Sequence, residues 1–182
     1  MYKDFKEIYH FIDKFKENDL SKLNSKISII FRNYEKKIDI ALLKKIKASC
    51  KKDKRKFYLA NNIKLAILLD LDGAYIPSFN NDLRHNNFSI RENFKIIGSA
   101  HNKKQINIKE RQKVDTIFLS PIFKMRKKKN LGIYKFLFLK NLTDKKIVAL
   151  GGINQQNIKN LKMINCYGFA SISLINNFIY KL

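Results

Sequence analysis

The chain has 182 residues, 45% of them apolar, and carries 38 Lys and Arg against 15 Asp and Glu, a formal net charge of +23. Fourteen Phe and eight Tyr can fill a sizeable core, which excludes a chain that is disordered throughout, and six Gly and two Pro are too few for a collagen-like protein. A length of this kind predicts one domain over residues 1–182.

The positive charge has a plainer explanation than nucleic-acid binding. Only six of the 38 basic residues are Arg, and 20 residues are Asn, a composition typical of A/T-rich codons. Since Arg leads in bidentate recognition of bases and phosphates, we expect no specific nucleic-acid partner. The charge still favours anionic ligands in any cleft. A continuous basic stripe on the folded surface would favour a nucleic-acid partner instead.

The two cysteines, Cys50 and Cys166, stand alone and form no zinc-site spacing. The first seven residues mix charges of both signs, unlike a signal peptide, and no apolar run approaches the ~18 residues that span a bilayer. We therefore expect a cytoplasmic protein without a membrane partner.

Eight short runs rich in Ile, Val, Phe and Leu predict strands. In chain order they are Ile8–Ile12, Ile27–Phe31, Phe57–Ala60, Gly73–Ile76, Lys95–Gly98, Asp115–Ser120, Ile147–Leu150 and Gly168–Ser173. Polar, lysine-rich segments of helical length separate them. One such segment, Ile38–Cys50, places its apolar residues on one helical face. The alternation is typical of βα units and a parallel sheet.

Eight units predict an α/β fold, a compact (β/α)8 TIM barrel. Its first and last units must be short, because only Phe15–Lys26 separates the first two strands and nine residues follow Ser173. The alternative is an open doubly wound sheet of five or six strands. Its usual phosphate-binding signatures, G-x-G-x-x-G and G-x-x-x-x-G-K-[ST], are absent.

Charged residues divide between the two faces of such a barrel. Asp70, Asp72 and Asp115 precede their strands, so neither paired catalytic carboxylates nor a carboxylate metal cage is expected at the catalytic face. The basic run 51–56 lies at the structural face and is interpreted as solvated surface. The run 124–129 follows the sixth strand, at the face where barrels carry their chemistry.

Two features at that face are candidates for chemistry. Gly151 and Gly152, with Ser171 and Ser173, match the phosphate cup that barrels build after strands seven and eight; the alternative is a tight turn with packed serines. His101 follows the fifth strand and is a candidate proton shuttle; the alternative is a histidine bonded to backbone.

Four blocks of the sequence together resemble the thiamine phosphate synthase/TenI family of (β/α) barrels. They are LAILLDLDGAYI at 65–76, IGSAHN at 97–102, VDTIFLSPIF at 114–123, and VALGGINQQN at 148–157 followed by GFASIS at 168–173. The resemblance implies a transferase of thiamine biosynthesis, which joins hydroxymethylpyrimidine diphosphate to a thiazole phosphate and expels pyrophosphate. It further implies phosphorylated small-molecule substrates and leaves open a homo-oligomer.

By matching position, the resemblance assigns roles to individual residues. Arg32 would contact the pyrophosphate, and Ser99 and Lys128 would help to hold it. Gly151, Gly152, Ser171 and Ser173 would hold the thiazole phosphate. In the TenI branch, which aromatises the thiazole by tautomerisation, the catalytic group matches His101.

The chain departs from the synthase pattern around the diphosphate. The family's two Mg²⁺-binding aspartates fall at Asn61 and Asn80, amides that bind a hard cation less well than carboxylates do. The family's Gln-x-Arg-Glu-Lys and Pro-Thr-x-Thr-Lys segments read 30–34 and 124–128, losing the glutamine, a lysine and two threonines. Lys124, with the lysines at 127–129, could replace the metal as point charges.

Three functions follow, in this order: a synthase with an altered diphosphate site, a TenI-type thiazole tautomerase, and a non-catalytic phosphate-binding barrel. Arg32 and Lys128 favour the first over the second, and His101 supports both. Asn61 and Asn80 favour either alternative over the synthase.

Overall fold

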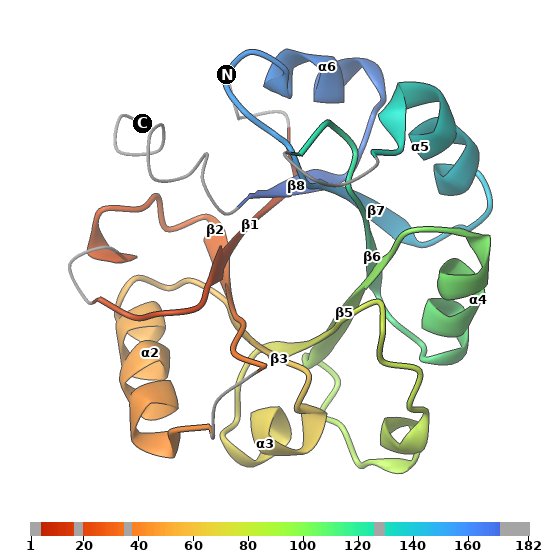
Figure 1. Cartoon of the computed structure of the whole chain (residues 1–182). Helices are drawn as coiled ribbons and strands as arrows, with labels where there is room; N and C mark the ends of the chain where they lie inside the picture. The colour runs from red at the N-terminus through yellow and green to blue at the C-terminus, as the bar shows by residue number, and fades with distance from the viewer. Residues whose placement is uncertain (1–4, 17–19, 35–37, 126–129, 172–182) are drawn as a thin grey trace.

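The computed structural model describes residues 5–16, 20–34, 38–125 and 130–171, and its strands form a closed parallel barrel (Figure 1). Strands that follow one another in the chain pair in the sheet, and β8 pairs with β1 to close the ring. The strands are β1 Glu7–Ile12, β2 Ile27–Phe31, β3 Phe57–Ala60, β4 Gly73–Ile76, β5 Lys95–Ala100, β6 Thr116–Leu119, β7 Lys146–Leu150 and β8 Gly168–Ser171. The predicted TIM barrel is confirmed, and the open doubly wound sheet is wrong.

The described helices lie outside the ring of strands (Figure 1). They are α2 Ile40–Lys52, α3 Ile63–Leu68, α4 Lys103–Arg111, α5 Gly132–Lys140 and α6 Ile158–Met163, with a 3₁₀ turn, η1 Arg84–Asn87. Helices α3 and α6 have only six residues each, which lets eight units fit into this short chain. Within the described residues, no helix has the length and apolar character needed to cross a membrane.

Two of these segments differ from the expected pattern. Helix α2 begins two residues later than predicted because the Asp39 carboxylate caps it, accepting from the backbone N–H groups of Ala41 at 2.9 Å and Leu42 at 3.2 Å. Between β4 and β5 the described chain forms η1 instead of a full helix. That segment contains Asn80, Asp82 and Asn86, whose short polar side chains favour turns over helix interiors.

Aromatic side chains fill the inside of the barrel. Tyr9, Phe11, Tyr58, Tyr75 and Phe118 are all buried, and their rings meet edge to face with centroids 4.9 to 6.2 Å apart. Alternate strand residues face outward and pack with the helices in a second, larger cluster. The barrel interior is therefore a packed core, and ligands can reach only its ends.

The amino-terminal ends of the strands carry structural carboxylates, as predicted. The Asp72 carboxylate accepts from the Phe57 N–H and that of Asp115 from the Ile96 N–H, both at 2.8 Å. The interpretation of the run 51–56 as solvated surface is wrong for Arg55, which is 5% exposed. Its guanidinium donates to three backbone carbonyls before β2 and to that of Ile27, the first residue of β2, and it pairs with Asp53 at 3.0 Å.

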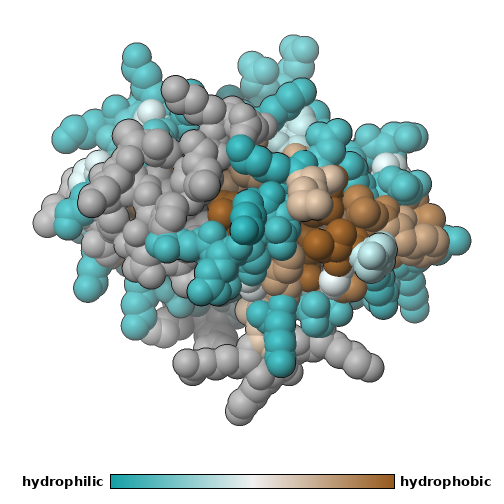
Figure 2. Space-filling model, turned by 90° about the horizontal axis from the view of Figure 1, so that it is seen from above, coloured by the Kyte–Doolittle hydropathy of each residue, from teal (hydrophilic) through white to brown (hydrophobic). Residues whose placement is uncertain are grey.

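Apolar side chains also gather on the outside of the barrel. Figure 2, seen from the side on which α5 and α6 lie, shows a hydrophobic patch where α5 is placed. Tyr134 and Phe138 of α5 are 91% and 62% exposed, and Met163 of α6 is 83% exposed. Exposed apolar clusters of this kind are typical of contact surfaces.

Candidate active site

A cavity of about 700 Å³ opens at the carboxyl ends of the strands. Its lining brings together seven of the predicted site residues, from segments far apart in the chain: Arg32, Ser99, His101, Lys124, Gly151, Gly152 and Ser171. Lys128 and Ser173 lie outside the described residues, and so does the rest of the run 126–129. The barrel topology therefore gathers an arginine, a lysine, a histidine and a glycine turn around one cavity. We call it the mouth cavity.

His101 is fixed at both ring nitrogens. Nδ1 lies 2.6 Å from the Ser120 carbonyl oxygen, and Nε2 lies 3.0 Å from the Ser78 hydroxyl. A carbonyl oxygen can only accept, so in the neutral ring Nδ1 carries the proton and Nε2 accepts from Ser78. The ring thus keeps a basic nitrogen at the cavity wall, while its backbone N–H donates to the Gln105 side chain at 2.7 Å.

Arg32 enters the cavity directly after β2. Its backbone N–H donates to the Ile12 carbonyl at 2.7 Å, and its guanidinium lies 5.5 Å from the centre of the Phe11 ring. Tyr34 follows and meets Phe79 edge to face at 5.4 Å. Burial raises the pKa of Tyr34 to about 12, although the positive charge of Arg32 lowers it. This wall therefore combines a cation with two aromatic rings.

Ser99 lies deeper in the cavity than these groups. It is 3% exposed and stands within hydrogen-bonding reach of the Tyr75 hydroxyl. Burial raises the pKa of Tyr75, so this phenol stays neutral at physiological pH. The two hydroxyl groups form a neutral polar floor below the charged rim.

The glycine turn is required by backbone conformation and by close packing. Gly151 and Gly152 have φ of +92° and +71°, in the left-handed region. A Cβ on Gly152 would lie 2.5 Å from the Phe123 carbonyl oxygen, and one on Gly151 would lie 2.7 Å from the Pro121 side chain. The Asn157 side chain donates to the Gly152 carbonyl at 2.8 Å. A tight turn, the plainer interpretation, accounts for these glycines, and anion binding by the same turn stays a prediction.

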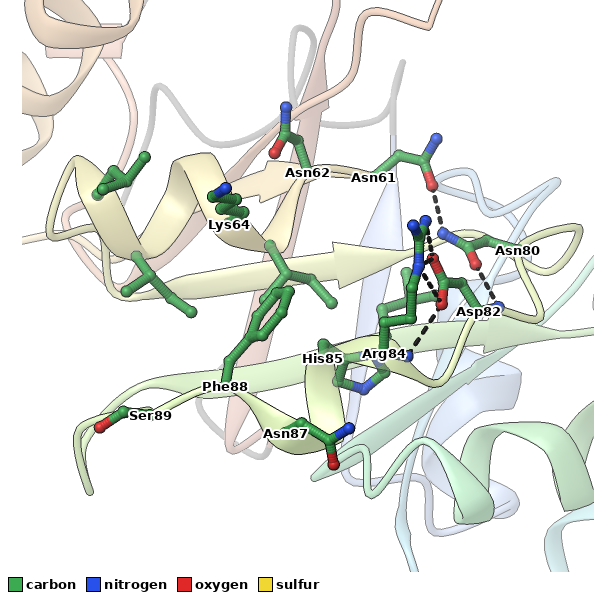
Figure 3. A pocket seen from close by; sticks show the side chains of 14 residues that line it. Asn61, Asn62, Lys64, Asn80, Asp82, Arg84, His85, Asn87, Phe88 and Ser89 are labelled. Atoms are coloured by element: carbon green, nitrogen blue, oxygen red, sulfur yellow. Dashed lines mark hydrogen bonds and ion pairs between the residues drawn. The ribbon is translucent and has the colours of Figure 1, made fainter.

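Asn61 and Asn80 lie together, but they line a neighbouring cavity of about 700 Å³ between α3 and η1 (Figure 3). Asn80 Nδ2 donates to Asn61 Oδ1 at 2.7 Å, and Asn80 Oδ1 accepts from the Asp82 N–H at 2.8 Å. The Asp82 carboxylate is held in turn by Arg84, whose hydrogen bonds lower the pKa of Asp82 to about 2. Both amide oxygens are therefore already occupied by N–H donors.

This donor set does not fit a divalent cation. Mg²⁺ prefers carboxylate oxygens in octahedral geometry, whereas the pair offers two neutral amide oxygens that would first have to give up hydrogen bonds. In the part of the chain that the structure describes, no three His, Cys, Asp or Glu residues form a group that could hold a metal ion. The cations that line the mouth cavity, Arg32 and Lys124, are available to an anionic ligand there.

Sequence reasoning missed several residues around His101. Ser78 and Ser120 hold its ring; Ser78 stands in none of the four blocks that resemble the family, and Ser120 stands in the block at 114–123 but was given no role. Lys109 and Gln112 are both 0% exposed and bind the backbone of the segment that carries Ser78. Lys109 is one of many lysines in the chain, so its residue type alone does not single it out. Only its position on the inner face of α4 could have indicated that it is buried.

Comparison with known proteins agrees with the fold. The family model for thiamine monophosphate synthase matches residues 22–175. The chain is 30% identical over 138 residues to a putative thiamine-phosphate synthase 2 of Aquifex aeolicus, covering 73% of each chain. It is 31% identical over 142 residues to a thiamine-phosphate synthase of Staphylococcus carnosus, covering 75% of this chain and 66% of that protein.

Solved structures share the barrel at lower identity. Thiamine phosphate pyrophosphorylase from Pyrococcus furiosus matches with a TM-score of 0.76 and 17% identity, over 94% of this chain and 87% of that one. A structure described as KGPDC from Streptococcus mutans matches with a TM-score of 0.66 and 10% identity, over 94% and 90%. Matches this distant show the fold alone. The family model and the curated relatives show more: the chain belongs to the thiamine monophosphate synthase family.

Proposed function

We propose that the chain is a transferase of thiamine biosynthesis, which joins hydroxymethylpyrimidine diphosphate to a thiazole phosphate. In this reaction the C–O bond between the pyrimidine methylene carbon and the diphosphate breaks, and the thiazole ring nitrogen forms a C–N bond to that carbon. Pyrophosphate leaves with the electron pair of the broken bond. The developing charges are positive on the pyrimidine and more negative on the leaving group.

The mouth cavity carries this proposal, because it offers cationic groups at separate places on one rim. Arg32 follows β2 and Lys124 follows β6, and these strands lie on opposite sides of the eight-stranded ring. Gly151, Gly152 and Ser171 come after β7 and β8, next to Lys124 in the order of the barrel. The rim thus offers two cations to a diphosphate and a separate glycine turn with Ser171 to a second phosphate, which suits two anionic substrates better than one.

The remaining assignments belong to the same proposal. Arg32 and Lys124, with Ser99 and Lys128, hold the diphosphate and stabilise its negative charge as it leaves. The glycine turn with Ser171 and Ser173 binds the thiazole phosphate. The transfer as written moves no proton, so the role of His101 as a proton shuttle belongs to the second candidate function. Asn61 and Asn80 contribute through their mutual hydrogen bond, which holds the loop beside the cavity. No step is assigned to a metal ion, since the amide pair does not fit one.

A second candidate function rests on His101. Its Nε2 is a basic nitrogen at the wall of the mouth cavity, and tautomerisation of a thiazole phosphate needs one group that takes a proton and returns it at another atom. This activity needs one phosphate site and no diphosphate site. The two functions therefore differ in their demand for Arg32.

The test is turnover by the purified chain of both sets of substrates. One reaction supplies hydroxymethylpyrimidine diphosphate with thiazole phosphate and is scored for thiamine phosphate. The other supplies the non-aromatic thiazole isomer and is scored for aromatisation. Thiamine phosphate formation is expected, with a loss of at least about ten-fold in Arg32→Gln, since one charge-assisted contact to a phosphate is worth roughly 1.5–3 kcal/mol.

Arg111→Gln is the matched control, because Arg111 is exposed at the end of α4 and does not line the mouth cavity. Aromatisation without thiamine phosphate, abolished by His101→Ala, would replace the transferase by the tautomerase. Absence of both products would overturn both activities and leave a barrel that binds phosphate without chemistry.

A further inference from the structure

Lys109 is a lysine in the protein interior. It lies on α4 and is 0% exposed, and its side-chain stem runs past Gly98 of β5, where an added Cβ would lie 3.0 Å from Lys109 Cδ. None of the ion pairs found between described residues includes it. Burial lowers the pKa of Lys109 to about 8. A buried lysine without an anionic partner destabilises the fold, so its presence calls for a reason.

All three N–H donors of the Lys109 ammonium group make hydrogen bonds. Nζ donates to the Pro77 and Asn80 carbonyls, each at 3.0 Å, and to Gln112 Oε1 at 2.7 Å. Gln112 Nε2 donates in turn to the carbonyls of Asn80 at 3.0 Å and Asp82 at 2.9 Å. Lys109 and Gln112 therefore donate hydrogen bonds to three carbonyls of the segment 77–82, those of Pro77, Asn80 and Asp82. We call this pair the clamp.

Ser78 stands between two of the residues that the clamp holds. Its hydroxyl lies 3.0 Å from Nε2 of His101, the nitrogen that accepts in the neutral ring. A hydroxyl on a surface loop would sample several rotamers and positions. Because Lys109 fixes the carbonyls on both sides of Ser78, this hydroxyl is kept within hydrogen-bonding distance of the ring.

We propose that Lys109 is a positioning residue, which holds the segment 77–82 so that the Ser78 hydroxyl stays hydrogen-bonded to His101 Nε2, the basic nitrogen of the ring at the mouth cavity. The proposal rests on the functions proposed above only because they give His101 a role in the mouth cavity. The hydrogen-bond geometry that it explains exists whatever the reaction is.

The choice of a lysine follows from this role. Methionine would fill the same volume beside Gly98 without placing a charge in the interior, but it would leave the Pro77 carbonyl without the donor that Lys109 provides. Loss of the proton leaves an amine with two N–H donors for three acceptors, so one contact must break. Charged or titratable groups lie on each element around the ammonium: Asp82, Arg84 and His85 on the segment 77–87, Lys95 on β5, His101 after it, and Lys103, Lys104, Glu110 and Arg111 on α4.

The experiment compares Lys109→Met with Lys104→Met, which removes an exposed lysine from the same helix. Two NMR readouts need no substrate: the ¹⁵N shifts of the His101 ring, which report the hydrogen bond at Nε2, and hydrogen exchange of the Asn80 and Asp82 amides, which are bonded within the segment. In Lys109→Met we expect exchange at least about ten-fold faster and a changed Nε2 shift, because the Ser78 hydroxyl no longer stays on this nitrogen. Lys104→Met should match the unsubstituted chain in both.

A titration adds a readout that a purely structural role would not move. The His101 ring shifts of the unsubstituted chain should show an inflection near pH 8 that is absent from Lys109→Met. Ser78→Ala leaves the clamp intact, so it should change the Nε2 shift without changing exchange; it also keeps the test open if Lys109→Met fails to fold. Unchanged exchange and an unchanged Nε2 shift in a folded Lys109→Met would overturn the proposal. Absence of turnover with these signatures intact would overturn the proposed function alone.

Discussion

Replacing both amides of the Asn61–Asn80 pair by carboxylates should create a cation site at this pair. Asn80 Nδ2 and Asn61 Oδ1 are 2.7 Å apart, so Asn61→Asp with Asn80→Asp sets two negative charges at roughly 4 Å once they relax. At that distance repulsion is about 1 kcal/mol in water and about 4 kcal/mol near a protein surface. Because Asn61 is exposed, we expect the lower part of this range, a loss of about 1–2 kcal/mol of unfolding free energy without metal.

Magnesium or manganese should reverse this loss in the double variant. A cation at 100 times its Kd adds about 2.7 kcal/mol, which for a chain of this size corresponds to a rise in Tm of roughly 5–11 °C. The unsubstituted chain should shift by less than about 1 °C under the same conditions. The assay is thermal unfolding followed by circular dichroism, with EDTA or with excess cation. The single variants, which lack the paired carboxylates, are the controls.

The reasoning would be refuted by a rise in Tm of the unsubstituted chain as large as that of the double variant. Such a rise would mean that the amide pair, or another group of the chain, already holds the cation. A double variant that stays insensitive to both cations would show that the two positions do not converge on one site.

Three further predictions concern stability. Arg55→Met should lower the unfolding free energy by about 3 kcal/mol or more, measured with urea, because four backbone carbonyls lose a buried donor; a loss below about 1 kcal/mol would contradict this. Gly152→Ala should destabilise the chain more than Gly132→Ala does in thermal unfolding. Both glycines have φ near +70°, where an alanine costs about 1–2 kcal/mol, but only at Gly152 would the added Cβ collide with backbone atoms. Equal effects of the two substitutions would refute the packing argument. The pKa of Lys109 is lowered from 10.5 to about 8, so on raising the pH the folded state releases this proton before the unfolded state does. The unfolding free energy should therefore rise between pH 8 and 10.5, relative to Lys109→Met, by roughly 2–3 kcal/mol. A difference between the two proteins that stays constant across this range would contradict the burial of the charge.

The strand pattern was predictable because buried parallel strands are short apolar runs, and the runs at 27–31, 57–60 and 73–76 match β2, β3 and β4 residue for residue. The ends of other strands were less predictable, because side chains decide them: the apolar run was expected to extend from Asp115 to Ser120, whereas β6 spans Thr116–Leu119 and the Asp115 carboxylate accepts from the Ile96 N–H just before it. Helix lengths were also less predictable than strand positions, as the short η1 segment shows.

The site was predictable to the extent that it lies at strand ends. Once eight strands are placed in a closed ring, Arg32, His101, Gly151 and Gly152 must meet at one face. The contacts of His101 could not be foreseen, since its partners Ser78 and Ser120 are ordinary loop residues. Burial of Lys109 and Arg55 could not be foreseen either, because lysine and arginine normally remain in water, and only the folded backbone presents the carbonyls that bind them.

The measurement that tests the account most directly is formation of thiamine phosphate by the purified chain in EDTA and in excess magnesium. If the side chains of the mouth cavity meet the charge of the diphosphate without a metal ion, product should form at the same rate in both conditions and should fall in Arg32→Gln in both. Product that forms only with magnesium, or a rate that ignores Arg32, would contradict the account.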